Sequence, residues 1–258
     1  MSHPSYESHA LLNQYLLFHY GSHEEVLPYS FGPRDALDFP QRCVSELVAA
    51  YLPEAKGRAL DVGCAVGRAS FELARYFDSV VGIDFSAAFI EAARELAAKG
   101  LLDYVRPHEG KVSLRSVAAV PAEIERSRVG FETGDAMALR EELGSFDLVM
   151  ACNLICRLPE PMRFLRRLPE LVKPGGVLVM TTPFTWLEQY TPPENWLGGN
   201  TEGGDSFNGL CEALGKHFEL LHEKDMPMLI KETARKYQWT VVQASVWRRH
   251  STADEAKG

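Results

Sequence analysis

The stretch ALDVGCAVGRASFELA, residues 59–74, decides the fold. It begins with apolar residues typical of a buried strand, continues through a glycine-rich turn and ends in a helical pattern. Gly63 and Gly67 carry no Cβ, so the backbone can turn sharply there and come close to a ligand. The spacing G-x-x-x-G differs from the dinucleotide fingerprint G-x-G-x-x-G and from the phosphate-binding loop G-x-x-x-x-G-K-[ST]. The turn therefore favours a nucleoside ligand, although packing alone can also require glycine at such a position.

Further apolar runs follow this stretch and are separated by segments of helical periodicity. The runs are SVVGIDF (79–85), RVGFETGD (128–135), FDLVMACN (146–153) and GGVLVMTTPF (175–184), and helices are predicted over 68–77, 86–99 and 161–171. Val/Ile/Leu runs divided by helices indicate an α/β fold with a parallel sheet covered on both faces. Two β-rich runs, 217–226 and 237–247, are expected to pair antiparallel at a sheet edge, and residues 103–128 to add a small strand or flap.

The N-terminal region precedes this alternating pattern. Apolar residues at steps of three and four predict a helix over 7–20, ending at Gly21. The loop that follows is rich in glycine, proline and aromatic residues, and a helix start is predicted at Asp38 and Pro40. We expect residues 1–40 to form a helical lid over a substrate, residues 41–248 to form the main domain, and residues 249–258 to be a disordered tail.

Composition excludes several classes of function. The chain has 258 residues, 27 basic against 35 acidic side chains and a net charge of −8, which argues against a nucleic-acid partner. No apolar run reaches the length of about 18 residues that a membrane helix needs. The start shows no signal-peptide pattern, so we expect a cytoplasmic protein without a membrane partner. Five cysteines in scattered positions, with Cys152 and Cys156 spaced C-x-x-x-C, indicate reduced thiols and no metal site.

Acidic and amide side chains follow the predicted strands. Asp84 ends the second strand, where a carboxylate in an open α/β sheet accepts hydrogen bonds from ribose hydroxyls. Asp135 follows the third strand and can accept from an exocyclic amine, with Met137 against an adenine face. Asn153 leaves the fourth strand at its carboxyl end, where ligands bind. Helix capping and turn formation are the structural alternatives for the two acids.

Taken together and in this order, these motifs resemble those of the class I S-adenosylmethionine-dependent methyltransferases, over about residues 40–248. The resemblance implies a Rossmann-like, seven-stranded, mostly parallel sheet with the last strand antiparallel. It implies S-adenosylmethionine as the cofactor and S-adenosylhomocysteine as its product. Gly63 and Gly67 would line the methionine part, Asp84 the ribose, and Asp135 with Ala136 the adenine. The full predicted cofactor set is Arg42, Asp61, Gly63, Cys64, Gly67, Asp84, Phe85, Asp135, Ala136, Met137 and Asn153.

A narrower resemblance extends over nearly the whole chain. Five phrases are similar to the methyltransferase domain of ovothiol biosynthesis, the 4-mercaptohistidine N1-methyltransferases: YESHALLNQYLLFHYG (6–21), LPYSFGPRDALDFPQRCV (27–44), LDVGCAVGRASFELAR (60–75), NLICRLPEP (153–161) and TTPFTWLEQYTPPENWLGG (181–199). This resemblance implies methyl transfer to an imidazole ring nitrogen of 5-thiohistidine, giving ovothiol A. A sulfoxide synthase and a lyase would be separate members of the pathway.

Side chains for such an acceptor can be proposed from these phrases. Flat rings suit stacking on an imidazole, and the candidates are Tyr15, Tyr20, Tyr29, Phe31, Trp186, Tyr190 and Trp196. Arg157 is the first choice for an acceptor carboxylate and Arg34 the second, whereas Arg42 is assigned to the carboxylate of the cofactor. His19 is a candidate general base because its ordinary pKa suits neutral pH, and Asn153 is the second candidate catalytic residue.

Other functions remain open from the sequence. Ordinary core or surface packing is the alternative for each aromatic and arginine side chain. The runner-up function is a methyltransferase for another small amine, thiol or carboxylate, because a fold does not fix a substrate. A non-catalytic cofactor-binding subunit is a third possibility, and an NAD-dependent oxidoreductase is disfavoured by the glycine spacing. The oligomeric state is not indicated.

Overall fold

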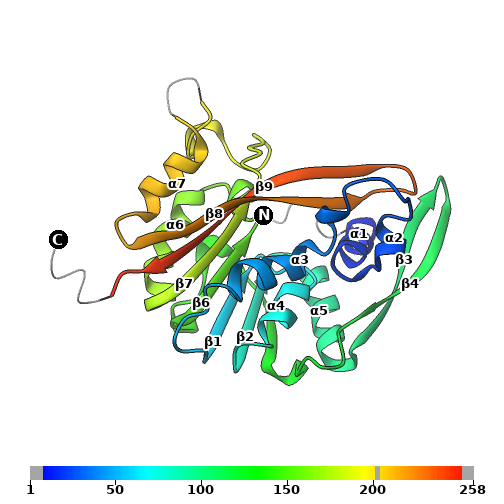
Figure 1. The fold of residues 1–258 in the computed structure, drawn as a ribbon, viewed down its shortest axis with the longest axis horizontal. Coiled ribbons are helices and arrows are strands. Elements are labelled where there is room, and N and C mark those ends of the chain that lie inside the picture. Colours follow the sequence, from blue (N-terminus) through cyan, green and yellow to red (C-terminus); the bar gives the residue numbers. More distant parts are fainter. Residues whose placement is uncertain (1–7, 201–203, 252–258) are drawn as a thin grey trace.

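The computed structural model describes residues 8–200 and 204–251 (Figure 1). Its helices are α1 (His9–Tyr20), α2 (His23–Val26), α3 (Phe39–Arg42), α4 (Arg68–Leu73), α5 (Ala87–Lys99), α6 (Pro161–Leu171) and α7 (Ser206–Leu214). Its strands are β1 (Arg58–Val62), β2 (Ser79–Asp84), β3 (Leu101–Glu109), β4 (Val112–Ala119), β5 (Val129–Thr133), β6 (Phe146–Cys152), β7 (Val172–Thr182), β8 (Phe218–Lys231) and β9 (Tyr237–Arg249). A π-helical segment, Cys43–Val48, continues α3.

The main sheet has seven strands in the order β5-β2-β1-β6-β7-β9-β8. The first five of these run parallel to one another, whereas β9 is antiparallel to both β7 and β8. The chain order reverses direction at β1, between β2 and β6, and ligands bind at the carboxyl ends of the strands beside such a switch point. The predicted α/β fold, with its antiparallel last strand, is confirmed.

Both faces of the sheet are buried, which explains the continuous apolar runs. Along β6, Leu148 and Met150 face one core cluster, and Val149 and Ala151 face the other, as the two-residue period of a strand requires. Residues of α4 and α5 and of the π-helical segment join the first cluster, and residues of α6 and α7 join the second. A strand that is covered on both sides cannot alternate apolar with polar residues.

The predicted helices lie close to their expected positions. α6 spans 161–171 as predicted, and α5 begins after Ser86, whose hydroxyl accepts from the Phe89 amide. α4 is shorter than predicted and ends at Leu73. Two helices were not predicted: α2, within the aromatic loop, and α7. Both begin with a side-chain cap, in α2 a reciprocal pair between Ser22 and Glu25.

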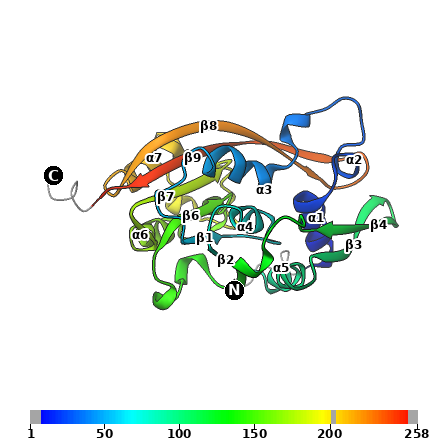
Figure 2. The ribbon, with the colours of Figure 1, turned by 60° about the horizontal axis from the view of Figure 1, so that its bottom comes forward.

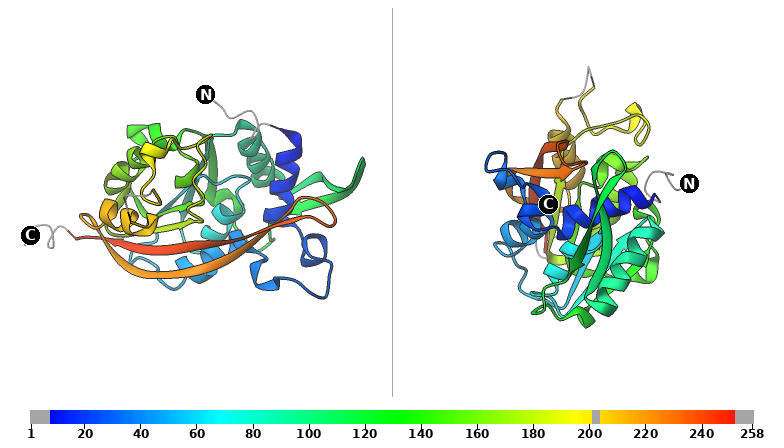
Figure 3. Two further views of the ribbon diagram at one scale, coloured as in Figure 1. Left: turned by 90° about the horizontal axis from the view of Figure 1, so that it is seen from above. Right: turned by 90° about the vertical axis from the view of Figure 1, so that its right-hand side faces the viewer.

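Two hairpins extend away from the sheet toward the same side of the molecule. β3 and β4 form a separate two-stranded hairpin, so the predicted flap at 103–128 is confirmed. β8 and β9 pair over their whole length, but β9 pairs with β7 only from Gln243 to Arg248. Figures 2 and 3 show the distal part of β8–β9 reaching past the sheet to the region of α1, α2 and the β3–β4 hairpin.

The N-terminal residues share the core of the main domain. Leu16, Leu17, Val26 and Leu27 belong to the same apolar cluster as β1 and α5. Motion of this region as a lid stays a prediction, and residues 1–7 and 252–258, the latter most of the predicted tail, lie outside the described residues. No helix in the described part of the chain is both long enough and apolar enough to cross a membrane.

Asp147 holds three strands together at the end of the sheet where β1 begins. Its side chain is 4% exposed and accepts from the Arg58 amide on β1 and from Nζ of Lys173 on β7, each at 2.8 Å. Burial raises the pKa of Asp147, but the hydrogen bonds from Lys173 and Arg58 outweigh it and hold the pKa below its ordinary value of 3.8.

Asp147→Asn is expected to lower the free energy of unfolding at pH 7 by about 1–3 kcal/mol, because two donors lose a charged acceptor. Since the folded pKa is depressed, the carboxylate stabilises the fold above pH 3.8 and loses this contribution as the pH falls through the folded pKa. Urea unfolding at pH 7 and pH 3 should therefore show a smaller difference from the wild type at pH 3. An equal difference at both pH values would contradict this account, and Asp103→Asn, at an exposed carboxylate, is the control.

Candidate active site

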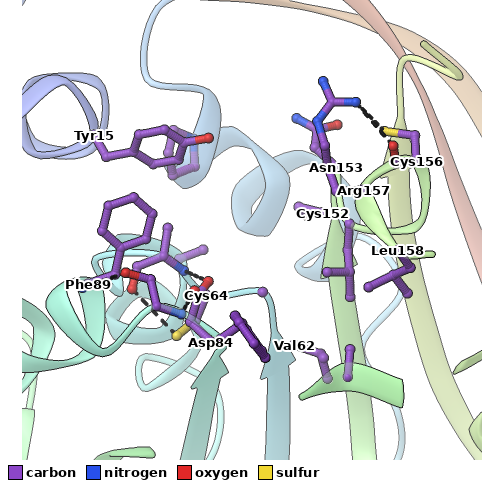
Figure 4. A pocket seen from close by; sticks show the side chains of 18 of the residues that line it. Tyr15, Val62, Cys64, Asp84, Phe89, Cys152, Asn153, Cys156, Arg157 and Leu158 are labelled. Carbon is purple, nitrogen blue, oxygen red and sulfur yellow. Dashed lines mark hydrogen bonds between the residues drawn. The ribbon is translucent and has the colours of Figure 1, made fainter. Parts of the chain in front are cut away.

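A cavity of about 830 Å³ opens at the carboxyl ends of β1, β2 and β6 (Figure 4). The predicted residues that line it are Tyr15, His19, Asp61, Gly63, Cys64, Asp84, Phe85, Asp135, Ala136, Met137, Asn153, Arg157 and Tyr190. They come from six separate parts of the chain, and the fold brings them together. The switch point of the sheet is thus the candidate site.

The glycine-rich turn forms the floor of the cavity beside β1. Gly63 has φ +77° and its amide donates to the Ile83 carbonyl on β2 at 2.7 Å. Ala65 has φ +48°, an uncommon conformation for a residue with a Cβ, and its amide donates to Oδ2 of Asp84 at 2.9 Å. Backbone held in such a conformation often marks a functional site, and here it fixes the turn against the end of β2.

Two carboxylates stand at the ends of β1 and β2. Asp84 is half-buried, and its oxygens accept from the Ala65 and Ser86 amides, each at 2.9 Å. Asp61 is 2% exposed and accepts from the Ser70 hydroxyl at 2.6 Å. Burial, opposed by the Ser70 hydrogen bond and assisted by the negative charge of Asp84, raises the pKa of Asp61 to about 7. The pair therefore makes this end of the cavity suited to groups that donate hydrogen bonds.

The segment after β5 supplies a third carboxylate. Oδ1 of Asp135 accepts from the Met137 amide at 2.8 Å, so the turn presents a carboxylate and an apolar side chain side by side. Both residues line the cavity, and Ala136 between them is buried. Their assignment to the adenine stays a prediction.

Asn153 stands at the end of β6, opposite the turn. It adopts φ +53°, its amide donates to the Thr181 carbonyl at 2.7 Å, and its Oδ1 accepts from the Thr181 hydroxyl at 3.0 Å. Its Nδ2 lies 3.2 Å from Sδ of Met228 on β8. The side chain is thus held in place by two further strands.

α1 closes the cavity from the other side. The Tyr15 ring packs on Phe89 with centroids 4.8 Å apart, and Figure 4 shows its hydroxyl directed toward the side of the cavity that holds Asn153 and Arg157. Burial, assisted by the charge of Asp84, raises the pKa of Tyr15 to about 12, so this hydroxyl keeps its proton at neutral pH.

His19 differs from its predicted role. Its ring is 8% exposed, and burial together with the positive charge of Arg68 lowers its pKa to about 3. A general base works best with a pKa near the operating pH. The neutral imidazole is therefore a poor base at neutral pH, which argues against the predicted general-base role.

Arg157 places a guanidinium at the far wall of the cavity. It donates to the carbonyls of Cys156 and Thr185, both at 3.1 Å, and its Cζ lies 5.0 Å from the centroid of the Tyr190 ring. Among the described residues it makes no ion pair with a carboxylate. Its charge is thus available to a ligand.

Two residues predicted for the cofactor lie outside the cavity. Arg42 forms an ion pair with Glu46 at 2.6 Å and donates to the Pro227 carbonyl at 2.9 Å, so its guanidinium is already engaged. Gly67 has φ +85°, and a Cβ there would lie 2.5 Å from the Phe131 ring. A glycine is therefore needed at this position for the packing of the helix on the sheet rather than for contact with a ligand.

Six residues predicted for the acceptor also lie outside it. Tyr29 and Phe31 stack on each other 5.2 Å apart in the aromatic loop, where Phe31 is 73% exposed and Arg34 donates to the Tyr29 carbonyl. Tyr20 donates to the Val66 carbonyl at 2.8 Å.

Trp186 and Trp196 stack on each other 6.4 Å apart. Their indole N–H groups donate to Ser206 and to the Thr191 carbonyl, both at 2.9 Å. Internal packing explains these rings.

The distal β8–β9 hairpin forms a wall that the sequence did not predict. Met228 pairs with Thr240 and Ile230 pairs with Gln238 across the hairpin, and all four line the cavity. On α1, Gln14 also lines it, and its Nε2 donates to the Lys231 carbonyl at 3.2 Å. The alternation of Met228 and Ile230 was the available signal, but it does not reveal what a strand beyond the sheet edge will face.

The cavity fits the predicted cofactor. Acidic side chains stand at the ends of β2 and β5, where ribose and adenine would need hydrogen-bond acceptors. Gly63 leaves space beside Leu154, because a Cβ at this position would lie only 3.1 Å from Cδ1 of Leu154. The remaining volume extends past Asn153 to Arg157 and the hairpin, so a second small molecule can occupy the same cavity.

Comparisons with known proteins agree with this geometry. Residues 60–178 match a family model described as a methyltransferase domain. A ubiquinone biosynthesis O-methyltransferase of Xanthomonas oryzae is 29% identical over 151 residues, which are 58% of this chain and 53% of that protein. The chain thus spans about half the length of the curated relatives it matches.

Solved structures share the fold at low sequence identity. The N-methyltransferase NodS of Bradyrhizobium japonicum, in complex with S-adenosylhomocysteine, aligns with a TM-score of 0.53 at 12% identity, over 92% of this chain and 98% of that one. A SAM-dependent methyltransferase of Methanosarcina mazei aligns with a TM-score of 0.51 at 19% identity, over 79% and 96% of the two chains. Residues 60–178 are thus similar to a methyltransferase domain, and the chain has the fold of these solved methyltransferases.

Proposed function

We propose that the protein transfers a methyl group from S-adenosylmethionine to an imidazole ring nitrogen of 5-thiohistidine. The observation that carries this proposal is Arg157, a cavity-lining guanidinium without a carboxylate partner among the described residues. It suits a small acceptor that brings its own carboxylate, as an amino acid does. The phrases similar to the 4-mercaptohistidine N1-methyltransferases support the choice of amino acid, because each of the five supplies residues that line the cavity.

The residues of this chain supply position rather than acid–base chemistry. When bound, S-adenosylmethionine supplies a methyl group on a sulfonium, and its leaving group is neutral. The protein must then align the acceptor with that methyl group and exclude water. Arg157 would hold the acceptor carboxylate, and the rings of Tyr15 and Tyr190 would lie beside a planar imidazole.

Regiochemistry depends on the pose of the acceptor. A thiohistidine that has lost its thiol proton has an electron-rich ring, so no strong base is needed to activate the nitrogen. The sulfur is the better intrinsic nucleophile, and the cavity must hold it away from the methyl group. The neutral state of His19 is consistent with a reaction that needs no imidazole base.

The test is mass spectrometry of a reaction with purified protein, S-adenosylmethionine and 5-thiohistidine, with histidine as the control acceptor. A single methyl group, mapped to a ring nitrogen by NMR and absent with histidine, would establish the proposal. No product, despite cofactor binding shown by calorimetry, would overturn it and point to another small amine, thiol or carboxylate, or to a phenol of the kind that O-methyltransferases accept.

Arg157→Met is expected to raise the KM for 5-thiohistidine about 10- to 100-fold, because charged hydrogen bonds of about 1.5–3 kcal/mol are lost. Affinity for S-adenosylmethionine should not change. The measurement is steady-state kinetics with 5-thiohistidine and with its decarboxylated analogue. The KM of the variant should differ from that of the wild type for 5-thiohistidine but not for the analogue, which has no carboxylate. Arg163→Met, on the exposed face of α6, is the control. A wild-type KM would disprove the carboxylate assignment.

A further inference from the structure

The last turn of α1 places His19 against the glycine-rich turn. Tyr20, the next residue, donates its hydroxyl to the Val66 carbonyl at 2.8 Å, and the Arg68 guanidinium lies 5.6 Å from the centroid of the Tyr20 ring. The charge of Arg68 also acts on His19 itself. His19 therefore lies beside this turn, and it lines the cavity together with Gly63, Cys64 and Ala65.

The two ring nitrogens of His19 differ in their exposure. Its Nδ1 is fully buried and has no hydrogen-bond partner among the described residues. Its Nε2 is not one of the buried unpaired atoms, so on this cavity-lining residue Nε2 is the ring nitrogen that a ligand can reach.

The proton of the neutral ring belongs on Nε2. A neutral imidazole carries one N–H and one lone pair, and the buried Nδ1 offers an N–H no acceptor. Orphaned buried N–H groups are rare because their desolvation is not compensated. With a pKa of about 3 the ring stays neutral at physiological pH, and Nε2 then carries the N–H of this cavity-lining residue.

The position of the His19 Nε2–H group indicates which part of the cofactor it would contact. In the sheet order β5-β2-β1, Asp135 and Asp84 follow the two outer strands, and they are the residues predicted for adenine and ribose. This leaves the turn after β1 for the amino-acid part. That part ends in an α-carboxylate. The two nearby arginines are engaged elsewhere, because Arg68 donates from Nε and NH2 to one Glu72 oxygen and Arg42 is paired with Glu46.

We propose that Nε2–H of His19 donates a hydrogen bond to the α-carboxylate of S-adenosylmethionine. His19 is then a cofactor-binding residue in place of the general base that the sequence indicated. A neutral donor at this point holds the carboxylate without placing a further positive charge beside the sulfonium of the cofactor. The inference does not depend on the identity of the acceptor.

The experiment is calorimetry of the full chain, without acceptor, with S-adenosylmethionine and with its decarboxylated form. His19→Phe keeps a flat ring but lacks the donor, and it should lower affinity for S-adenosylmethionine about 10-fold while changing that for the decarboxylated form less than about 2-fold. His19→Gln, which restores an N–H near the Nε2 position, should recover part of the loss. Tyr20→Phe, which loosens the same helix turn, should affect both ligands alike.

Equal weakening of both ligands by His19→Phe would overturn the proposal and leave a packing role. A second measurement on the wild type covers the case of misfolded variants. Long-range proton–nitrogen NMR of the histidine rings should show His19 protonated at Nε2, with that nitrogen shifted by S-adenosylmethionine and not by the decarboxylated form. A ring protonated at Nδ1 in the complex would equally overturn it.

Discussion

Asp84→Ala is expected to weaken S-adenosylmethionine binding by about 10- to 100-fold, since hydrogen bonds to a charged acceptor contribute about 1.5–3 kcal/mol. The substitution removes two sets of hydrogen bonds that the carboxylate accepts, one from the ligand and one from the backbone. It would accept from the ribose hydroxyls, and it already accepts from the Ala65 and Ser86 amides at 2.9 Å. Loss of the second set would also loosen the turn that shapes the cavity.

Calorimetry with S-adenosylhomocysteine measures this effect without turnover. Asp84→Asn keeps the shape of the side chain and one carbonyl oxygen, so it should fall between wild type and Asp84→Ala. Asp103→Ala, at an exposed carboxylate on β3, should bind as the wild type does. A folded Asp84→Ala protein with unchanged affinity would disprove the ribose assignment.

Gly67→Ala is expected to lower the free energy of unfolding by about 2–5 kcal/mol, because strain in the left-handed backbone adds to overpacking. The glycine has φ +85°, and a Cβ would lie 2.5 Å from Cζ and 2.7 Å from Cε1 of Phe131. Phe131 cannot retreat freely, because its ring also lies against Gly82 and contacts Phe71 edge to face at 5.4 Å.

Gly110→Ala separates the two contributions. Gly110 has φ +55° in the turn between β3 and β4, and a Cβ there would meet nothing within 4 Å. This variant should lose only the backbone part, about 1–2 kcal/mol. Urea unfolding of both variants gives the two changes in the free energy of unfolding. Similar decreases at the two positions would show that the contact with the Phe131 ring adds no destabilisation to Gly67→Ala.

The residues predicted for the cofactor could be expected to meet in one cavity because their signals in the sequence are local. Gly63, Asp84, Asp135 and Asn153 each follow directly after an apolar run, and parallel strands bring their carboxyl ends to one edge. Gly67 was predicted to contact the cofactor but packs against the Phe131 ring. The sequence indicates that a glycine is needed there, but not whether a ligand or a ring approaches it.

The acceptor side could not be predicted in the same way. Its wall depends on contacts between distant segments, such as Gln14 with the Lys231 carbonyl, 217 residues apart. Trp186 and Trp196 share a phrase with Tyr190, yet only Tyr190 lines the cavity, because the two indoles stack on each other. Burial also changes the pKa of a predicted residue. The sequence suggests that His19 titrates near neutral pH, whereas burial and the charge of Arg68 lower its pKa to about 3.

The distal part of the β8–β9 hairpin has a consequence for the order in which the molecule is assembled. A ribosome releases residues 58–153, with the turn and the acids of the cofactor side, long before it releases the hairpin. α1 is synthesised before this hairpin, and it can dock on Lys231 only after the hairpin has been released. The half of the cavity that is predicted to hold the cofactor can therefore form during synthesis, whereas the half that is predicted to bind the acceptor is completed only after segments 217 residues apart have met.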